Sequence, residues 1–245
     1  ELEVSANGSG FVPMFVTVAS RTTAGVGGTY SYETGSVPYN GNYVFRVRAV
    51  NAHTGAVSAW SEPSSVCSTP FLPGDRLACY RGQVDLQGRT SPAGAPIFVD
   101  GFPVTVSDSQ GHWTVCGATV ARHRIGARPR AYLESRMDGV QGVAGGTVQL
   151  PRTTIAGGDV NNDVSVNLFD LVTVGADYGS EPPGNPDADA NGDGAVNLFD
   201  LVMVGSNYGL TGPLAWASST HAAQAAPRLT GARVDLDVLD RVVNG

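Results

Sequence analysis

The 245-residue sequence contains no lysine, and all 15 of its basic residues are arginine. Only 15% of the residues are charged and 8% are aromatic, whereas about a quarter are charged in an average soluble domain. The longest apolar stretch, residues 11–19, is about half of the ~20 residues that a helix needs to cross a bilayer. We therefore expect no membrane span, and the formal net charge of −7 argues against a nucleic-acid partner.

Cysteine is also scarce. The three cysteines, Cys67, Cys79 and Cys116, show none of the C-x-x-C spacing that is typical of zinc or redox motifs. If the protein is secreted, one disulfide can form, and Cys79 with Cys116 is the favoured pair because both lie in strand-like runs of one predicted module. By contrast, 32 glycines and 15 prolines favour many short strands joined by tight turns.

Negative charge is concentrated in one segment. Residues 157–210 contain nine acidic residues and no arginine, whereas the rest of the chain contains 13 acidic residues and 15 arginines. Crowded like charges raise the free energy of a compact state. Because this segment also contains apolar runs, we interpret it as a folded segment that binds a cation.

The same segment contains an internal repeat. Residues 166–172 and 196–202 share the sequence VNLFDLV, at an offset of thirty residues, and an alternating run of Asp and Asn precedes each copy. Counted from the first Asp, oxygen-bearing side chains fall at positions 1, 3, 5, 9 and 12, and position 7 offers a backbone carbonyl. The residues at these positions are Asp159, Asn161, Asp163, Ser165, Asn167 and Asp170, and then Asp189, Asn191, Asp193, Ala195, Asn197 and Asp200.

This spacing predicts two twelve-residue calcium loops, each running into a helix. Calcium prefers six to eight hard oxygen ligands, and a turning loop directs alternate side chains inward to supply them. The second loop has Gly194 at position 6, where the chain turns sharply, but the first has the β-branched Val164. We therefore expect two bound calcium ions, with tighter binding in the second loop.

The paired loops resemble a type I dockerin over residues 157–213, because each is followed by a helix and lacks the entering helix of an EF-hand. The resemblance implies a small α-helical F-hand module that folds around calcium and binds a cohesin domain. In that family, loop positions 10 and 11 face the cohesin. Here they are Leu168 with Phe169 and Leu198 with Phe199, apolar where many dockerins have hydroxyl groups.

The two Leu-Phe pairs have a second interpretation. Helical spacing places Leu171, Val174 and Tyr178 on one face, and their repeat counterparts on another, so that the two helices pack together. The pairs lie just before these faces and extend the same core in that interpretation. A module this small leaves apolar surface exposed, however, which favours a docking patch.

The rest of the chain is predicted to be β-structure. Residues 1–68 alternate in strand fashion, and residues 43–51 with 58–63 resemble the last strands of a fibronectin type III domain, which implies a partial Ig-like sandwich. Residues 74–156 resemble the prealbumin-like regulatory sandwich of carboxypeptidases. The predicted fold is thus mainly β and multi-domain, with two sandwiches and the small calcium-loop module.

Other parts of the sequence leave alternatives open. The basic run of Arg122, His123, Arg124, Arg128 and Arg130 is predicted to be a solvated strand face, with contact to acidic glycans as the alternative. Residues 214–231 are predicted to be a linker, and residues 232–245 a strand of a further or neighbouring β-domain. That strand either belongs to a longer polypeptide or completes the sheet of another subunit.

No catalytic motif is evident, and the four histidines are scattered along the chain. We therefore predict a non-catalytic extracellular protein that acts in cell-surface attachment or protein assembly. Its predicted partner is a cohesin-like domain or a neighbouring subunit of the same protein. The alternative is an accessory C-terminal region of a larger secreted glycoside hydrolase or peptidase.

Overall fold

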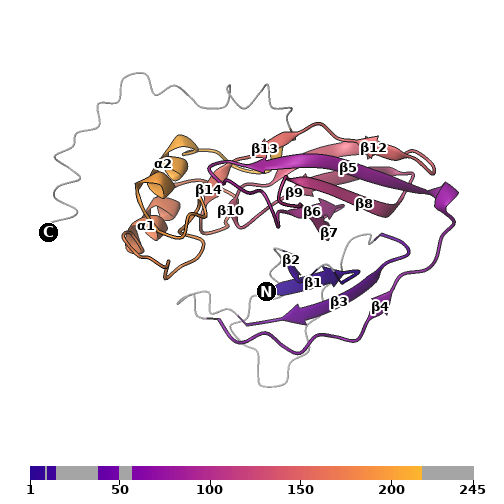
Figure 1. Ribbon diagram of the computed structural model, residues 1–245, viewed down its shortest axis with the longest axis horizontal. Coiled ribbons are helices and arrows are strands. Elements are labelled where there is room, and N and C mark those ends of the chain that lie inside the picture. Colours follow the sequence, from indigo (N-terminus) through magenta and orange to yellow (C-terminus); the bar gives the residue numbers. More distant parts are fainter. Residues whose placement is uncertain (9, 15–37, 50–56, 217–245) are drawn as a thin grey trace, which may run out of the picture.

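The computed structural model describes residues 1–8, 10–14, 38–49 and 57–216. These residues form a mainly β structure with two α-helices, which confirms the predicted mainly β class. Figure 1 shows a four-stranded sheet beside a two-sheet sandwich, with the two helices at one end of the sandwich. No helix in the described ranges is long and apolar enough to cross a bilayer.

The N-terminal sheet is antiparallel, in the order β2-β1-β3-β4. Its strands are β1 (Leu2–Ala6), β2 (Val12–Pro13), β3 (Asn42–Val47) and β4 (Cys67–Ser68). Val4 and Tyr43 are buried on the inner face, and the Tyr43 ring packs edge-on against Phe102 of the sandwich at 5.2 Å. The sheet therefore shares a core with the sandwich. The strands that we predict within residues 15–37 lie outside the described residues.

Two sheets form the sandwich. In the first, the long strand β5 pairs with β8 along one side and with β12 and then β13 along the other. The second has the order β15-β11-β9-β6-β7. The strands are β5 (Leu77–Leu86), β6 (Pro96–Val99), β7 (Phe102–Val106), β8 (His112–Thr119), β9 (Arg122–Ala127), β11 (Ser135–Gln141), β12 (Thr147–Gln149), β13 (Thr153–Ile155) and β15 (Leu214–Ala215); the short 3-10 turn η1 (Gly74–Arg76) precedes β5.

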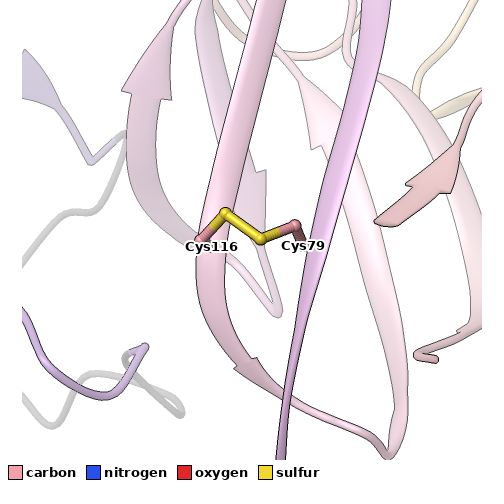
Figure 2. The surroundings of a disulfide bond; sticks show 2 residues. All are labelled: Cys79 and Cys116. Carbon is pink, nitrogen blue, oxygen red and sulfur yellow. A yellow bond between two sulfur atoms is a disulfide. The ribbon is translucent and has the colours of Figure 1, made fainter. Parts of the chain in front are cut away.

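The core between these sheets is filled by alternating side chains. Tyr80 and Val84 of β5, Ile97 of β6 and Ile125 of β9 are fully buried, as the two-residue period of a strand with one covered face requires. A disulfide joins Cys79 to Cys116 across β5 and β8, with the two Cα atoms 4.1 Å apart (Figure 2). The favoured cysteine pair is therefore confirmed, and Cys67 is an exposed free thiol on β4.

The chain enters the first repeat from a small two-stranded sheet. β10 (Ala131–Tyr132) pairs antiparallel with β14 (Gly157–Asp159), so that Asp159, the first predicted ligand, is the last residue of a strand. The sandwich thus fixes the position at which the first loop begins.

After the second helix the chain returns to the sandwich. Leu214 and Ala215 form β15, which pairs in parallel with β11 and forms one edge of the second sheet. Trp216 is 5% exposed, packs edge-on against Trp113 and donates its indole N–H to the Pro151 carbonyl at 2.8 Å. The start of the predicted linker at 214–231 is therefore ordered sheet, because a buried tryptophan anchors it. Its remainder and the strand predicted at 232–245 lie outside the described residues.

The helical end and the sandwich share one core. Met203 is 5% exposed and lies so close to Gly88 and Gly157 that a Cβ at either glycine would clash with it. Asn207 donates its side-chain amide to the Gly157 carbonyl at 2.7 Å and to the side-chain oxygen of Gln87 at 2.5 Å. Residues 157–213 therefore pack on the sandwich rather than forming a separate body.

Shortening Met203 tests this shared core. Met203→Ala removes a buried side chain that touches both parts, and we expect it to lower the free energy of unfolding by about 2–5 kcal/mol. The exposed neighbour Val202 is the matched control, and Val202→Ala should change stability by less than about 0.5 kcal/mol. Thermal unfolding is followed by far-UV and near-UV circular dichroism. Two separate transitions, with only the helical one shifted, would contradict a shared core.

Candidate metal centre

The two repeats form a pseudo-symmetric pair of loop–helix units. We call residues 159–170 the first loop, residues 189–200 the second loop, and residues 157–213 the loop–helix module. α1 (Leu168–Ala176) follows the first loop and α2 (Leu198–Ser206) the second. Val166, at position 8 of the first loop, exchanges two backbone hydrogen bonds with the turn after α2, and Val196 does the same with the turn after α1. Each loop is thus tied to the end of the other helix.

The position-12 carboxylates, Asp170 and Asp200, are fully buried at the helix N-termini. Each accepts the backbone N–H of its loop's position 9 at 2.8 Å and that of position 3 at 3.0 or 3.1 Å. The position-9 side chains, Asn167 and Asn197, cap the helices by accepting the backbone N–H two residues ahead at 2.8 Å. These residues form a capping box in each repeat, which explains why each helix begins at its Leu-Phe pair.

The other predicted ligands form a ladder of tight turns. The position-5 carboxylates, Asp163 and Asp193, accept the side-chain amide of position 3 at 2.9 and 3.0 Å. They also accept the backbone N–H of position 7, which is Ser165 or Ala195, at 3.0 and 3.1 Å. Within the described ranges, no three acidic, histidine or cysteine side chains converge as a metal-holding group. The two-ion prediction thus remains a prediction.

Position 6 requires a left-handed backbone in both loops. Its φ is +79° at Val164 and +97° at Gly194, and the backbone N–H of this residue donates to the position-1 carboxylate at 3.1 and 3.0 Å. A β-branched residue is strained in this region, whereas glycine adopts it freely. The loops therefore share one path, but the first adopts it with strain.

Asp159 is the most unusual of the position-1 and position-12 carboxylates. Its side chain is 0% exposed, and its Oδ1 atom has no hydrogen-bond partner in the structure. Burial raises the pKa of the Asp159 carboxyl to about 6, although the Arg128 guanidinium, with Nη2 3.7 Å from Oδ2, acts in the opposite direction. An orphaned buried carboxylate oxygen is costly unless a cation or a donor satisfies it. The first loop therefore fits a hard cation at Asp159.

The predicted partner-binding residues lie on the surface. Leu168 and Leu198 are 59% and 60% exposed, and Phe169 and Phe199 are each 69% exposed. They do not extend the core, because the helices contribute the buried Val174, Met203 and Val204 to it, with the partly buried Leu171 and Leu201 packed against it. Val172 and Val202 are also exposed, and we call these six exposed side chains, three on each helix, the apolar patch.

The predicted helix faces need one correction. Tyr178 and Tyr208 are 54% and 48% exposed, so they do not belong to the helix–helix core. α1 ends at Ala176 and α2 at Ser206, and each tyrosine lies in the turn that follows. The predicted helical spacing therefore does not apply to the two tyrosines, because both helices end before them.

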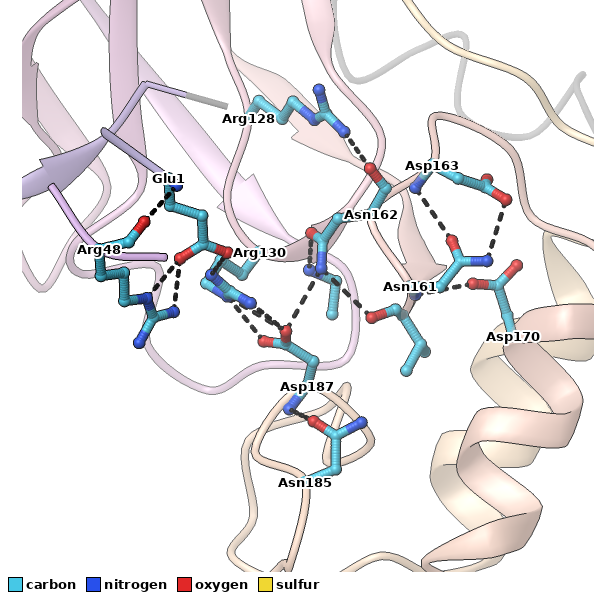
Figure 3. A network of polar contacts seen from close by, with 12 residues as sticks. Glu1, Arg48, Arg128, Arg130, Asn161, Asn162, Asp163, Asp170, Asn185 and Asp187 are labelled. Atoms are coloured by element: carbon cyan, nitrogen blue, oxygen red, sulfur yellow. Dashed lines mark hydrogen bonds and ion pairs between the residues drawn. The ribbon is translucent and has the colours of Figure 1, made fainter. Parts of the chain in front are cut away.

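The basic run divides between several roles (Figure 3). Arg128 donates to the Asn162 carbonyl of the first loop at 2.9 Å, and Arg130 forms an ion pair with Asp187, which precedes the second loop, at 2.5 Å. Spacing within one strand gave no sign of these contacts, because their partners are distant in the sequence. The predicted solvated strand face is therefore wrong for Arg128, whose side chain is 12% exposed, and for the buried His123. Arg130 lies at the surface, as predicted, and forms its ion pair there.

His123, in the same run, is buried and belongs to the sandwich. Its Nδ1 lies 2.7 Å from the Asp100 carboxylate, and its Nε2 lies 2.9 Å from the Thr119 carbonyl and 3.2 Å from the Thr119 hydroxyl. The carbonyl is the nearer partner, so the ring ties together two turns of the sandwich. We therefore assign His123 a structural role in the sandwich and no catalytic role.

Comparisons with known proteins give only distant likenesses. No protein-family model matches the sequence, and no curated protein matches it significantly. Two solved structures show a distant likeness to this chain. They are a C-terminal and an N-terminal interface mutant of the type II cohesin–X-dockerin complex from Acetivibrio cellulolyticus. They are 20% and 19% identical to this chain, with TM-scores of 0.49 and 0.46, and each match covers 55% of this chain and 97% of the other.

A third likeness, to the Bacillus anthracis TIE protein, has 9% identity and a TM-score of 0.27; it covers 47% of this chain and 25% of the other. Likeness at these levels assigns this chain to no family.

The left-handed turn in the loops can be tested with a matched pair of substitutions. An added Cβ meets no atom within 4 Å at Gly194 or at Gly205 of α2, and only Gly194 has a positive φ. Gly194→Ala should therefore lower the free energy of unfolding by about 1 kcal/mol. Gly205→Ala should leave it unchanged or raise it by up to about 1 kcal/mol. Equal melting temperatures for the two variants would contradict the left-handed turn.

Proposed function

We propose that this protein is a non-catalytic assembly protein, in which the loop–helix module folds around two calcium ions outside the cell and docks a protein partner through the apolar patch. The observation that carries the proposal is the repeated exposure of one Leu-Phe pair at the start of each helix, next to loops rich in calcium-type ligands. Large apolar side chains that are exposed together on the surface of a helix are typical of protein interaction sites.

The position of the patch supports a link between docking and calcium. Leu168 and Phe169 lie directly before Asp170, the position-12 carboxylate of the first loop, and the second repeat has the same order. A cation that fixes this carboxylate also fixes the first turn of the helix, where the Leu-Phe pair lies. We infer that the patch takes its binding shape when the loops are filled.

Two features favour a secreted protein. A disulfide joins β5 to β8, and disulfides persist mainly in oxidising compartments. Calcium sites with weak to moderate affinity fill readily at the millimolar calcium of extracellular fluids. The proposed partner is a cohesin-like domain or a neighbouring subunit of the same protein.

Calcium removal tests the metal part of the proposal. An ion that binds only the folded state stabilises it by mass action, by about 4 kcal/mol when its concentration is a thousand times its dissociation constant. We expect millimolar calcium to raise the melting temperature above the value in chelator. Magnesium at the same concentration should do so far less, because it retains its waters and demands a tighter geometry. Identical melting curves in calcium and in chelator would overturn the calcium assignment.

A double substitution tests the docking part. Phe169→Ala with Phe199→Ala removes both aromatic rings of the patch, and we expect at least a hundredfold loss of partner affinity with unchanged calcium binding. Phe71→Ala is the matched control, since Phe71 is 81% exposed and belongs to another part of the chain. Binding is measured by surface plasmon resonance on immobilised type I and type II cohesins, and self-association by sedimentation.

The same experiment can reject the docking role. A wild-type chain that binds none of these cohesins and remains monomeric in calcium would contradict it. Equal affinities for the double variant and the Phe71 control would show that the patch is not the contact surface.

A further inference from the structure

The two loops have the same ligand types at positions 1, 3, 5, 9 and 12, but the sandwich places different charges beside them. Arg128 follows β9 and reaches the first loop, where its side chain is only 12% exposed. Its Nη2 atom donates to the Asn162 carbonyl at 2.9 Å, a contact drawn as a dashed line in Figure 3, and lies 3.7 Å from Oδ2 of Asp159. A fixed positive charge therefore lies beside the first predicted ligand of this loop.

The surroundings make this charge effective. Asp159 is 0% exposed, so little solvent separates it from the guanidinium, and buried charges interact more strongly than exposed ones. A divalent cation on Asp159 shares the carboxylate with Arg128, and the two positive charges repel each other. Without the ion, Arg128 neutralises part of the charge of the loop and holds its backbone through Asn162.

The second loop has a different neighbour. Arg89 approaches it from the sandwich, but its Nε donates to a backbone carbonyl, that of Ala190, at 3.3 Å, and its guanidinium lies over the Tyr132 ring. Both oxygens of Asp189 accept backbone N–H groups of their own loop. Within the described part of the chain, no basic side chain forms an ion pair with a carboxylate of the second loop.

We propose that the positive charge of Arg128 lowers the calcium affinity of the first loop, so that the second loop binds calcium first. This inference rests on the proposed calcium function. It predicts that the first loop binds calcium only at a higher concentration than the second loop. The identity of the ligands does not produce this difference, since the two loops share them.

The test is a calcium titration of the full chain, followed by NMR at the amides of Phe169 and Phe199. These amides are matched reporters, because each donates to its position-9 asparagine at 2.8 Å. In the wild-type chain, the Phe199 amide should shift at a calcium concentration at least about tenfold lower than the Phe169 amide. Shifts of both amides at the same calcium concentration, or of Phe169 at the lower concentration, would overturn the proposal.

Three variants separate charge from shape. Arg128→Gln removes the charge and should raise the affinity of the first loop at least about tenfold, with the second loop within about twofold of the wild type. Arg128→Lys keeps the charge and should retain the weak first loop. Arg89→Gln removes the arginine that contacts only backbone in the second loop, and should not raise the affinity of the first. An unchanged or lower first-loop affinity in Arg128→Gln would overturn the proposal.

The outcomes also distinguish this inference from the proposed function. If neither amide shifts with calcium, the calcium function itself is wrong. If both shift with equal affinity and Arg128→Gln changes neither, calcium binding stands and the role of Arg128 is wrong. If Arg128→Gln does not fold without calcium, Val164→Gly decides instead, because it removes the strained residue at position 6 and keeps Arg128. The first loop should still fill after the second in that variant, and simultaneous filling of the two loops would overturn the proposal.

Discussion

The structure depends on buried carboxylates at the start of each repeat. Asp159, Asp170 and Asp200 are fully buried in a segment that contains no arginine of its own, and buried charge is costly without a compensating partner. Backbone N–H groups satisfy much of Asp170 and Asp200, and the sandwich supplies Arg128 to Asp159. The remaining need for positive charge is the physical reason for proposing calcium. The same carboxylates set the first turn of each helix and hence the place of the apolar patch.

The sandwich does more than carry the loop–helix module. It starts the first loop at the end of β14, anchors the chain again through β15, and packs Gly88 and Gly157 against Met203 of α2. Arg130 adds an ion pair to Asp187, between the two repeats. Because these contacts join the module to the sandwich, its stability depends on residues outside the repeats. A module cut from this chain would lose that support.

Much of the structure was predictable from the sequence because it depends on local patterns. The spacing of Asp and Asn in the twelve-residue loops predicted the helix that follows each loop, and strand alternation with cysteine placement indicated the pairing of Cys79 with Cys116. The failures are contacts between distant segments or ends of elements. Neither the Arg128–Asp159 contact nor the burial of Trp216 has a local signal. The helical period of the sequence also continues to Tyr178, beyond the residue at which the helix ends.

The most direct test of the central claim is the number of calcium ions bound by the intact chain, measured by equilibrium dialysis with metal analysis at millimolar calcium. Two ligand loops, each with buried carboxylates at positions 1 and 12, predict two calcium ions per chain. A folded chain that retains no calcium, while both helices stay ordered, would show that backbone N–H groups and Arg128 alone satisfy these carboxylates, and would contradict the calcium-folded docking module.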